Sequence, residues 1–225
     1  MQGPTSQRVL EEHFPKISKM RFMDVSTIPI AGAECWVSRS GYTGDDGFEI
    51  SIPSQAAEIV TTSLLEHETV ELAGLGARDS LRLEAGLCLY GQDIDATTSP
   101  VAAGLKWAMH TSRLSGGYKE GKFPGAEKIL SEISDGTEYK LVGFVPLGKA
   151  PIRANTELFV RSSSSDKIGW ITSGSFSPTL KHPIALGYVK KEYSIQGNRV
   201  NAQVRGKLLE IEVTKLPFVK KNFKK

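Results

Sequence analysis

The apolar and polar positions in the first half of the chain follow two different periods. Residues 48–52 alternate strictly between apolar and polar side chains, which predicts a strand with one buried face. Residues 34–38 form a second short strand pattern. Residues 54–66 instead repeat their apolar side chains at helical spacing, and Ser54 can cap this helix. The pattern therefore predicts strands mixed with helices in this half.

Two further helices are expected in the first half. A tight turn leads into a short helix over residues 5–12. Either Asp79 or Ser80 can cap a helix over residues 77–86, and Gly86 fits its C-terminal end. A turn like the one before residue 5 normally follows a strand, and the sequence begins too close to it to contain one. We therefore expect the N-terminus to be a cut end.

The second half of the chain has a different pattern of apolar and polar residues. It contains short apolar or alternating runs separated by turn signals, one of which covers residues 174–178. The six runs cover residues 141–145, 157–160, 167–172, 183–189, 199–204 and 208–213. Their spacing of about ten residues is typical of a small antiparallel barrel or sandwich.

The predicted fold class is α+β, with a partial antiparallel sheet and helices followed by a C-terminal antiparallel β-barrel or jelly-roll-like domain. We expect residues 1–112 to form the α+β part and residues 138–225 to form the barrel. Residues 113–137 are rich in Ser, Gly, Lys and Glu. They are expected to be a linker that contains a short helix over residues 124–133.

Composition excludes several classes of protein. The 225 residues are 40% hydrophobic and 24% charged, which is ordinary for a globular protein and excludes collagen-like, coiled-coil and disordered chains. No run approaches about 18 apolar residues, so no membrane span is expected, and the N-terminal segment lacks the apolar core of a signal peptide. Cys35 and Cys88 are too few for a disulfide framework and are expected to be buried thiols in a reducing compartment.

The net charge of +3 conceals an uneven distribution. Residues 1–112 carry 8 basic and 15 acidic side chains, whereas residues 113–225 carry 20 and 10. The basic half indicates contact with something anionic. Its lysines are mostly dispersed and no motif for reading nucleic acid is present, so neither nucleic acid nor a membrane is expected as a partner.

Familiar catalytic motifs are absent from the sequence. It contains no phosphate-binding loop, no dinucleotide-binding glycine motif and no nucleophile elbow. The four histidines have no metal-ligand spacing, so no metal site is expected. No residue is assigned a catalytic role.

Three residues beside glycines can bind a ligand. Glu49 follows the glycine-rich segment 41–47, and its carboxylate can accept two adjacent N–H donors; a solvent-facing strand residue is the simpler interpretation. Arg78 can form either an ion pair with a neighbour or a bidentate contact to a ligand carboxylate. Tyr42 can be either a packing lid or a stacking surface.

Several longer motifs occur together in this sequence. They cover residues 2–4, 40–50, 75–91, 172–174, 176–178, 185–189 and 215–219. Together they closely resemble, in the same order and over nearly the whole chain, the motifs of the aminomethyltransferase (T-protein) family of the glycine cleavage system. The match at residues 81–91 and 217–219 favours this family over the related folate-binding part of dimethylglycine and sarcosine dehydrogenases.

The resemblance implies a transferase activity. The family transfers the aminomethyl group carried on the lipoyl arm of the H-protein to tetrahydrofolate, releasing ammonia and forming 5,10-methylenetetrahydrofolate. It implies tetrahydrofolate as the co-substrate, no metal, and the lipoyl H-protein as the partner. It also implies the mitochondrial matrix as the location, although no transit peptide is visible.

The resemblance further implies a set of folate-binding residues. The family's folate-binding glutamate matches Glu49, and its folate-binding arginine, 29 residues later, matches Arg78. The loop tyrosine near the folate matches Tyr42, and a C-terminal aromatic substrate contact, usually tyrosine, matches Phe223, which lacks the hydroxyl. These roles agree with the chemistry, because a pterin edge presents two adjacent N–H donors to a carboxylate and the anionic glutamyl tail suits an arginine.

One family feature has no counterpart in this chain. Family members have an N-terminal half with an aspartate that lies against the folate ring nitrogens, and no residue here matches it. Asp45 and Asp46 belong to the glycine-rich segment and are not that motif. The alternative interpretation is therefore a truncated, catalytically inactive fragment that binds folate or the H-protein.

Overall fold

The computed structural model describes residues 1–161, 163 and 165–224. It contains two compact units. The first comprises Met1–Ala85 together with Val219–Lys225, and the second comprises Gly86–Phe218. Each unit is a set of residues that contact one another. The domain boundaries expected near residues 112 and 137 stay a prediction.

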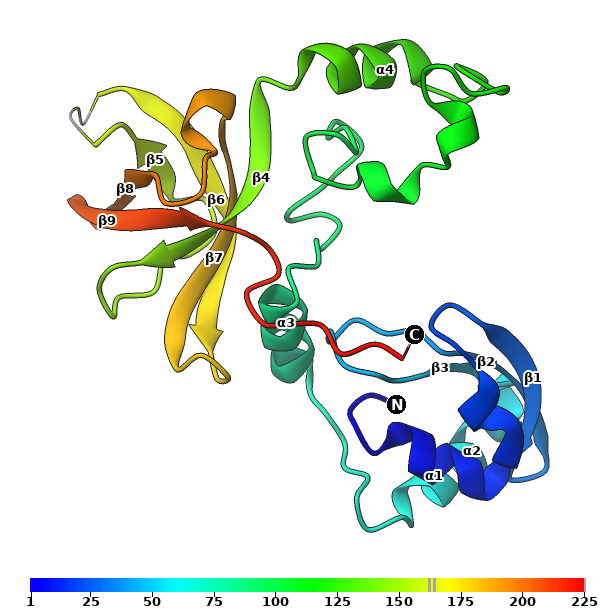
Figure 1. The fold of residues 1–225 in the computed structure, drawn as a ribbon. Coiled ribbons are helices and arrows are strands. Elements are labelled where there is room, and N and C mark those ends of the chain that lie inside the picture. Colours follow the sequence, from blue (N-terminus) through cyan, green and yellow to red (C-terminus); the bar gives the residue numbers. More distant parts are fainter. Residues whose placement is uncertain (162, 164, 225) are drawn as a thin grey trace. The chain divides into compact units, whose positions relative to one another are not determined.

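The first unit contains one small antiparallel sheet with the strand order β1-β2-β3 (Figure 1). The strands are β1 (Val25–Ile30), β2 (Ala33–Ser38) and β3 (Glu49–Ser51). The helices are α1 (Ser6–His13), α2 (Ala57–Leu65) and α3 (Leu75–Glu84), with 3₁₀ turns at Pro15–Lys19 and Ser54–Ala56. Figure 1 shows α1 and α2 on the same side of the sheet, where the core lies.

The core of this unit forms between one face of the sheet and these two helices. Ile28 and Val37 from the strands are fully buried, as are Leu10 from α1 and Val60 from α2. Burying an aliphatic side chain of this size contributes about 1.5–3 kcal/mol to stability. The opposite face of the sheet carries exposed side chains, including Trp36 at 67% exposure. The sheet therefore has one packed face and one open face.

Most of the elements predicted for this unit are present, with differences at their ends. Strand β1 has no counterpart among the predicted strands; it contains Pro29, which fits here since β1 is an edge strand. Helix α3 begins at Leu75, two residues earlier than predicted, and neither Asp79 nor Ser80 caps it. Asp79 instead accepts a hydrogen bond from Nε of Arg82 at 2.8 Å. Ser54 likewise makes no capping hydrogen bond.

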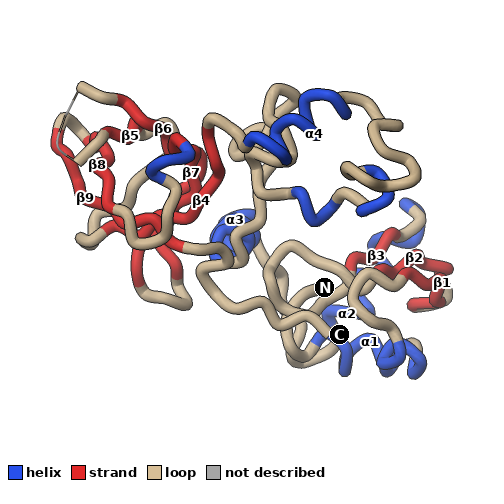
Figure 2. Tube along the Cα trace, turned by 45° about the horizontal axis from the view of Figure 1, so that its top comes forward, coloured by secondary structure: helices blue, strands red, loops and turns tan. Residues whose placement is uncertain are grey.

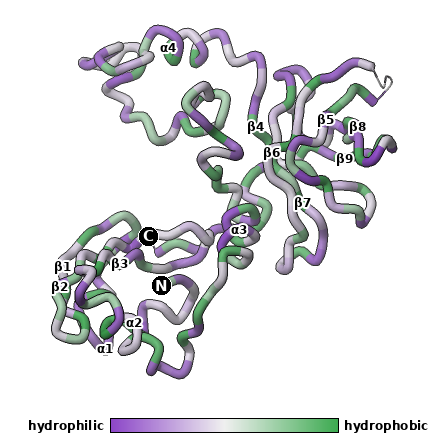
Figure 3. The backbone as a smooth tube through the Cα atoms, turned by 180° about the vertical axis from the view of Figure 1, so that it is seen from behind, coloured by the Kyte–Doolittle hydropathy of each residue, from purple (hydrophilic) through white to green (hydrophobic). Residues whose placement is uncertain are grey.

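The second unit contains a closed antiparallel barrel with the strand order β4-β7-β6-β5-β8-β9. The strands are β4 (Tyr139–Pro146), β5 (Glu157–Phe159), β6 (Lys167–Ser177), β7 (His182–Lys190), β8 (Arg199–Val204) and β9 (Lys207–Thr214). Fully buried side chains such as Phe144, Leu158 and Ile211 fill its core. In Figure 3 hydrophobic and hydrophilic positions are interspersed along the barrel strands, as expected for strands with one face inside.

The segment before the barrel is mostly loop, as Figure 2 shows. Its helix α4 (Ala126–Asp135) lies close to the helix predicted at residues 124–133, and short 3₁₀ turns occur at Lys106–Ala108 and Thr111–Arg113. Another 3₁₀ turn, Lys191–Tyr193, follows β7.

The structure confirms the predicted fold class, an α+β part followed by an antiparallel barrel. The turn predicted at residues 174–178 is wrong, because β6 continues to Ser177 and pairs with β7. Gly174 lies within this strand, where a Cβ atom would overlap the carbonyl of Ile152. A glycine can thus mark close backbone packing inside a strand as well as a turn.

Candidate functional site

The glycine loop, residues 40–47, connects β2 to β3 and is anchored by a buried arginine. Nε of Arg39 donates to Oδ1 of Asp46 at 2.9 Å, and a second guanidinium nitrogen donates to Oδ2 of the same carboxylate. The guanidinium also donates to the carbonyl of Met20 at 2.9 Å and to Oε1 of Gln7 at 2.7 Å. One side chain therefore ties the loop to α1 and to the 3₁₀ turn that follows it.

The side chain of Gln2 occupies the inside of the glycine loop. Its Nε2 donates to the carbonyl of Ser40 at 3.1 Å, and its Oε1 accepts from the hydroxyl of Thr43 at 3.1 Å. A Cβ atom at Gly41 or at Gly47 would overlap the Gln2 amide. Neither glycine has a positive φ, so these two loop glycines make room for one amide group rather than for an unusual backbone conformation.

Glu49 lies at the start of β3 and is exposed on the open face of the sheet. Its Oε2 accepts a hydrogen bond from the Ser40 hydroxyl at 2.7 Å, and the Ser40 and Ser38 hydroxyl oxygens are 2.7 Å apart. Ser38 is the residue opposite Glu49 in the β2–β3 register. Trp36 projects from the same face. The carboxylate is therefore held in place while remaining open to a ligand.

The structure brings Tyr42 and Arg78 together. The Cζ atom of Arg78 lies 4.8 Å from the centre of the Tyr42 ring, within the range of a cation–π contact. Arg78 lies in the first half of α3 and is exposed. In the described part of the chain no hydrogen bond or ion pair joins Arg78 to Glu49. Glu49 and Arg78 thus lie in the same unit, and Tyr42 contacts the arginine.

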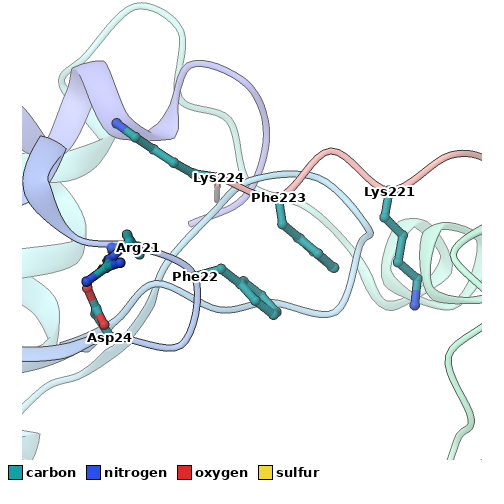
Figure 4. A pocket seen from close by; sticks show the side chains of 6 residues that line it. All are labelled: Arg21, Phe22, Asp24, Lys221, Phe223 and Lys224. Atoms are coloured by element: carbon teal, nitrogen blue, oxygen red, sulfur yellow. Dashed lines mark hydrogen bonds between the residues drawn. The ribbon is translucent and has the colours of Figure 1, made fainter. Parts of the chain in front are cut away.

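Phe223 lies in the C-terminal segment, which packs against the glycine loop. The amide of Asn222 donates to the carbonyl of Gly44 at 2.8 Å. The Phe223 ring stacks on the Phe22 ring with centroids 4.2 Å apart and an interplanar angle of 10° (Figure 4). The two rings form one wall of a pocket of about 620 Å³. The pocket is lined by Arg21, Phe22, Asp24, Lys221, Phe223 and Lys224.

The polar groups of this pocket are mostly cationic. In Figure 4 Lys221 and Lys224 extend on opposite sides of Phe223, and Arg21 lies beside Asp24. Nζ of Lys224 donates to the carbonyl of Ser18 at 2.9 Å, so this lysine is tied to the 3₁₀ turn at Pro15–Lys19. Flat apolar rings beside positive charges suit a ligand that carries both an aromatic group and an anion.

A second set of sequence motifs meets around Asp93 in the other unit. Its buried carboxylate accepts from the amide of Leu89 at 2.9 Å and from the hydroxyls of Thr172 and Ser173 at 2.5 and 2.7 Å. The Tyr188 hydroxyl donates to the Asp93 carbonyl at 2.9 Å. This cluster fastens the loop after residue 86 to strands β6 and β7 and thus has a structural role.

The surroundings of Tyr188 disfavour its ionised form. Burial is the largest cause that raises the pKa of its phenol, followed by the nearby groups of Cys88 and Asp93. The phenol is therefore held protonated, as its hydrogen bond to the Asp93 carbonyl requires.

No metal site is apparent in the described part of the chain, where no group of three or more His, Cys, Asp or Glu side chains is placed to hold an ion. Among the same residues, none of the helices has the length and hydrophobicity needed to cross a membrane.

Sequence reasoning missed the residues that hold the site together. Gln2 belongs to a motif recognised at residues 2–4, but only the fold shows its amide inside the glycine loop. Ser40 and Arg39 precede the first loop glycine, and nothing in their spacing indicates that one binds Glu49 and the other binds Asp46. Phe22 lies in a segment with no predicted element.

Two family models match most of the chain. The model for the GCVT N-terminal domain matches residues 1–113, and the model for the glycine cleavage T-protein C-terminal barrel domain matches residues 140–220. The chain belongs to the glycine cleavage T-protein family. The second match coincides with the closed barrel, and the first includes the glycine loop and α3.

Curated members of this family have closely similar sequences. The mitochondrial aminomethyltransferase of Solanum tuberosum is 48% identical over 223 residues, which cover 97% of this chain and 53% of the potato protein. The mitochondrial aminomethyltransferase of Dictyostelium discoideum is 42% identical over 100% of this chain and 57% of its own length. The chain thus spans about half the length of the curated relatives it matches.

A solved structure of the family has the same fold. The crystal structure of glycine cleavage system aminomethyltransferase T from Bartonella henselae matches with a TM-score of 0.90 and 38% identity. The match covers 100% of this chain and 60% of the bacterial chain.

Proposed function

We propose that this chain provides the tetrahydrofolate-binding half of an aminomethyltransferase of glycine cleavage. In the proposed reaction the aminomethyl group leaves the lipoyl sulfur of the H-protein and is transferred to tetrahydrofolate. The carbon–sulfur bond breaks and leaves the lipoyl thiol, the aminomethyl carbon becomes the bridge of 5,10-methylenetetrahydrofolate, and ammonia is released. Relatives named aminomethyltransferase support this activity.

The observation that carries the proposal is the exposed, hydrogen-bonded carboxylate of Glu49 beside the glycine loop. It can accept the two adjacent N–H donors of a pterin edge. Tyr42 offers a ring face to the ligand, and Arg78, which lies against that ring, can pair with a carboxylate of the glutamyl tail.

Phe223 is proposed as an aromatic contact to the ligand. Its stack with Phe22 leaves the pocket with apolar walls and cationic side chains, which suits the benzoyl and glutamyl parts of a folate. Because the stack needs no hydroxyl, phenylalanine can serve where the family usually has tyrosine. The basic charge of the second half supports contact with something anionic, and the lipoyl H-protein is the proposed protein partner.

Calorimetry tests the binding part of this proposal. Tetrahydrofolate is titrated into the 225-residue chain and into Glu49→Gln and Arg78→Gln, with Glu58→Gln on an exposed helix position as the matched control. We expect affinity about tenfold lower in the first two variants and unchanged affinity in the control. Equal affinity in all four proteins would refute these roles.

A second candidate is a fragment that binds folate or the H-protein without transfer. It is motivated by the 53% of the potato relative that the chain covers. Incubation with aminomethylated H-protein and tetrahydrofolate distinguishes the two. Formation of 5,10-methylenetetrahydrofolate supports the enzyme, whereas folate binding without product supports the fragment.

The proposed location is the mitochondrial matrix. Relatives from plants and Dictyostelium are named as mitochondrial proteins. Fractionation of source cells with an antibody to this chain tests the location, and recovery outside the matrix fraction would contradict it.

A further inference from the structure

We propose that Ser40 and Ser38 form a positioning device that aims the Glu49 carboxylate at its ligand. This inference rests on the proposed function of Glu49. The Ser40 hydroxyl lies 2.7 Å from Oε2 of Glu49 and 2.7 Å from the Ser38 hydroxyl.

The direction of the hydrogen bonds follows from the number of protons. An ionised carboxylate only accepts, so Ser40 must donate its single proton to Glu49. The Ser40 oxygen can then only accept from Ser38, which therefore donates. Ser38 thus donates to Ser40 and Ser40 donates to Glu49, so the direction of both hydrogen bonds is fixed.

The backbone that carries Ser40 is itself held. Its carbonyl accepts from Nε2 of Gln2 at 3.1 Å, and the preceding residue is the buried Arg39 with its ion pair to Asp46. Ser38 lies in β2 directly opposite Glu49. Both hydroxyls are thus attached to a rigid frame, so the carboxylate loses less freedom when a ligand binds.

The arrangement leaves the carboxylate able to bind. The two carboxylate oxygens have about four acceptor positions in total, and Ser40 uses one of them. The remaining positions can receive two parallel N–H donors. The held carboxylate can therefore still bind a ligand that presents paired donors on one edge, such as a pterin.

Comparing the binding of two ligands distinguishes the positioning role of Ser40 from a general effect on the loop. Tetrahydrofolate carries the pterin edge, whereas p-aminobenzoylglutamate carries only the ring and the acidic tail. We expect Ser40→Ala to weaken tetrahydrofolate binding about tenfold and to leave p-aminobenzoylglutamate binding unchanged. Ser38→Ala is expected to have a smaller effect in the same direction. Ser40→Thr, which keeps the hydroxyl, is expected to retain affinity.

The matched controls are Ser51→Ala, an exposed serine on the same strand as Glu49, and Ser40→Ala in the Glu49→Gln background. Neither change is expected to lower the affinity for tetrahydrofolate relative to the protein into which it is introduced. If Glu49→Gln weakens tetrahydrofolate but Ser40→Ala does not, the positioning role is wrong and the proposed function survives. If Ser40→Ala weakens both ligands, the serine supports the loop in general, which also overturns the role. If Glu49→Gln has no effect, both proposals fail.

Discussion

Arg39 and Asp46 join the two ends of the glycine loop through an ion pair in which the guanidinium is 1% exposed. The two residues lie seven positions apart, so the chain between them closes into a loop that carries Tyr42. The same guanidinium lies 4.9 Å from the centre of the Phe48 ring. A buried cation thus sets the shape of the segment that presents the candidate ligand residues.

The first prediction concerns this ion pair. Asp46→Asn removes the anion and leaves a buried guanidinium without its charge partner, so we expect the free energy of unfolding to fall by about 3 kcal/mol. Urea denaturation followed by fluorescence measures this change. Glu157→Gln breaks the exposed pair with Lys167 and is the control, with an expected loss of about 0–1 kcal/mol. Equal losses in both variants would contradict the special role of the buried pair.

The second prediction concerns Gly41. Gly41→Ala introduces a Cβ atom that overlaps the Gln2 amide, so we expect destabilisation of about 1–3 kcal/mol, measured by thermal unfolding. Gly148→Ala is the control, because a Cβ atom there meets nothing within 4 Å. Adding Gln2→Ala to Gly41→Ala should recover part of the loss. No recovery would show that the strain has another source.

The third prediction concerns Asp93. Asp93→Asn replaces an acceptor that serves an amide and two hydroxyls with a group that can accept at only one of its two ends. We expect a loss of about 2–3 kcal/mol and faster hydrogen exchange at the Leu89 amide. Glu192→Gln, at an exposed position of the same unit, should leave both quantities unchanged. Protection of Leu89 in Asp93→Asn would refute the anchoring role.

The fourth prediction concerns alkaline pH. Because burial raises the pKa of Tyr188 above the ordinary value of 10.0, its contribution to stability is fully present below about pH 10. Above that pH the unfolded phenol ionises while the folded phenol stays protonated, so stability falls as pH rises. Denaturation midpoints measured between pH 9 and pH 11 should fall less steeply in Tyr188→Phe. Tyr118→Phe, at 78% exposure, should keep the original slope.

Local patterns were sufficient for the elements that follow simple periods. The alternation at residues 48–52 predicted β3, because a half-buried strand needs a two-residue period, and the six runs separated by turn signals predicted the barrel strands. The local patterns failed where a residue occupied its position for an unusual structural reason. No pattern was recognised over the edge strand that contains Pro29, and Gly174 indicated a turn inside a strand.

For the candidate ligand residues too, the sequence indicated some features and only the structure showed others. Glu49, Arg78, Tyr42 and Phe223 were selected from motifs, and their roles stay a prediction. Their surroundings could not be read from the sequence, because the contacts join residues that are far apart in the chain. Gln2 reaches Ser40 across 38 residues, and Lys224 reaches Gln7 across 217.

The amino-acid sequence by itself determined the family, the class of fold and the order of most elements, since these depend on local period, turn chemistry and motif order. Only the tertiary structure decided that the six strands close into a barrel and that an amide fills the glycine loop. It also decided that the Ser40 hydroxyl meets the carboxylate of Glu49 and that Ser38 in turn meets Ser40. The physical reason is that hydrogen bonds and close packing act over a few ångströms in space, whatever the distance along the chain.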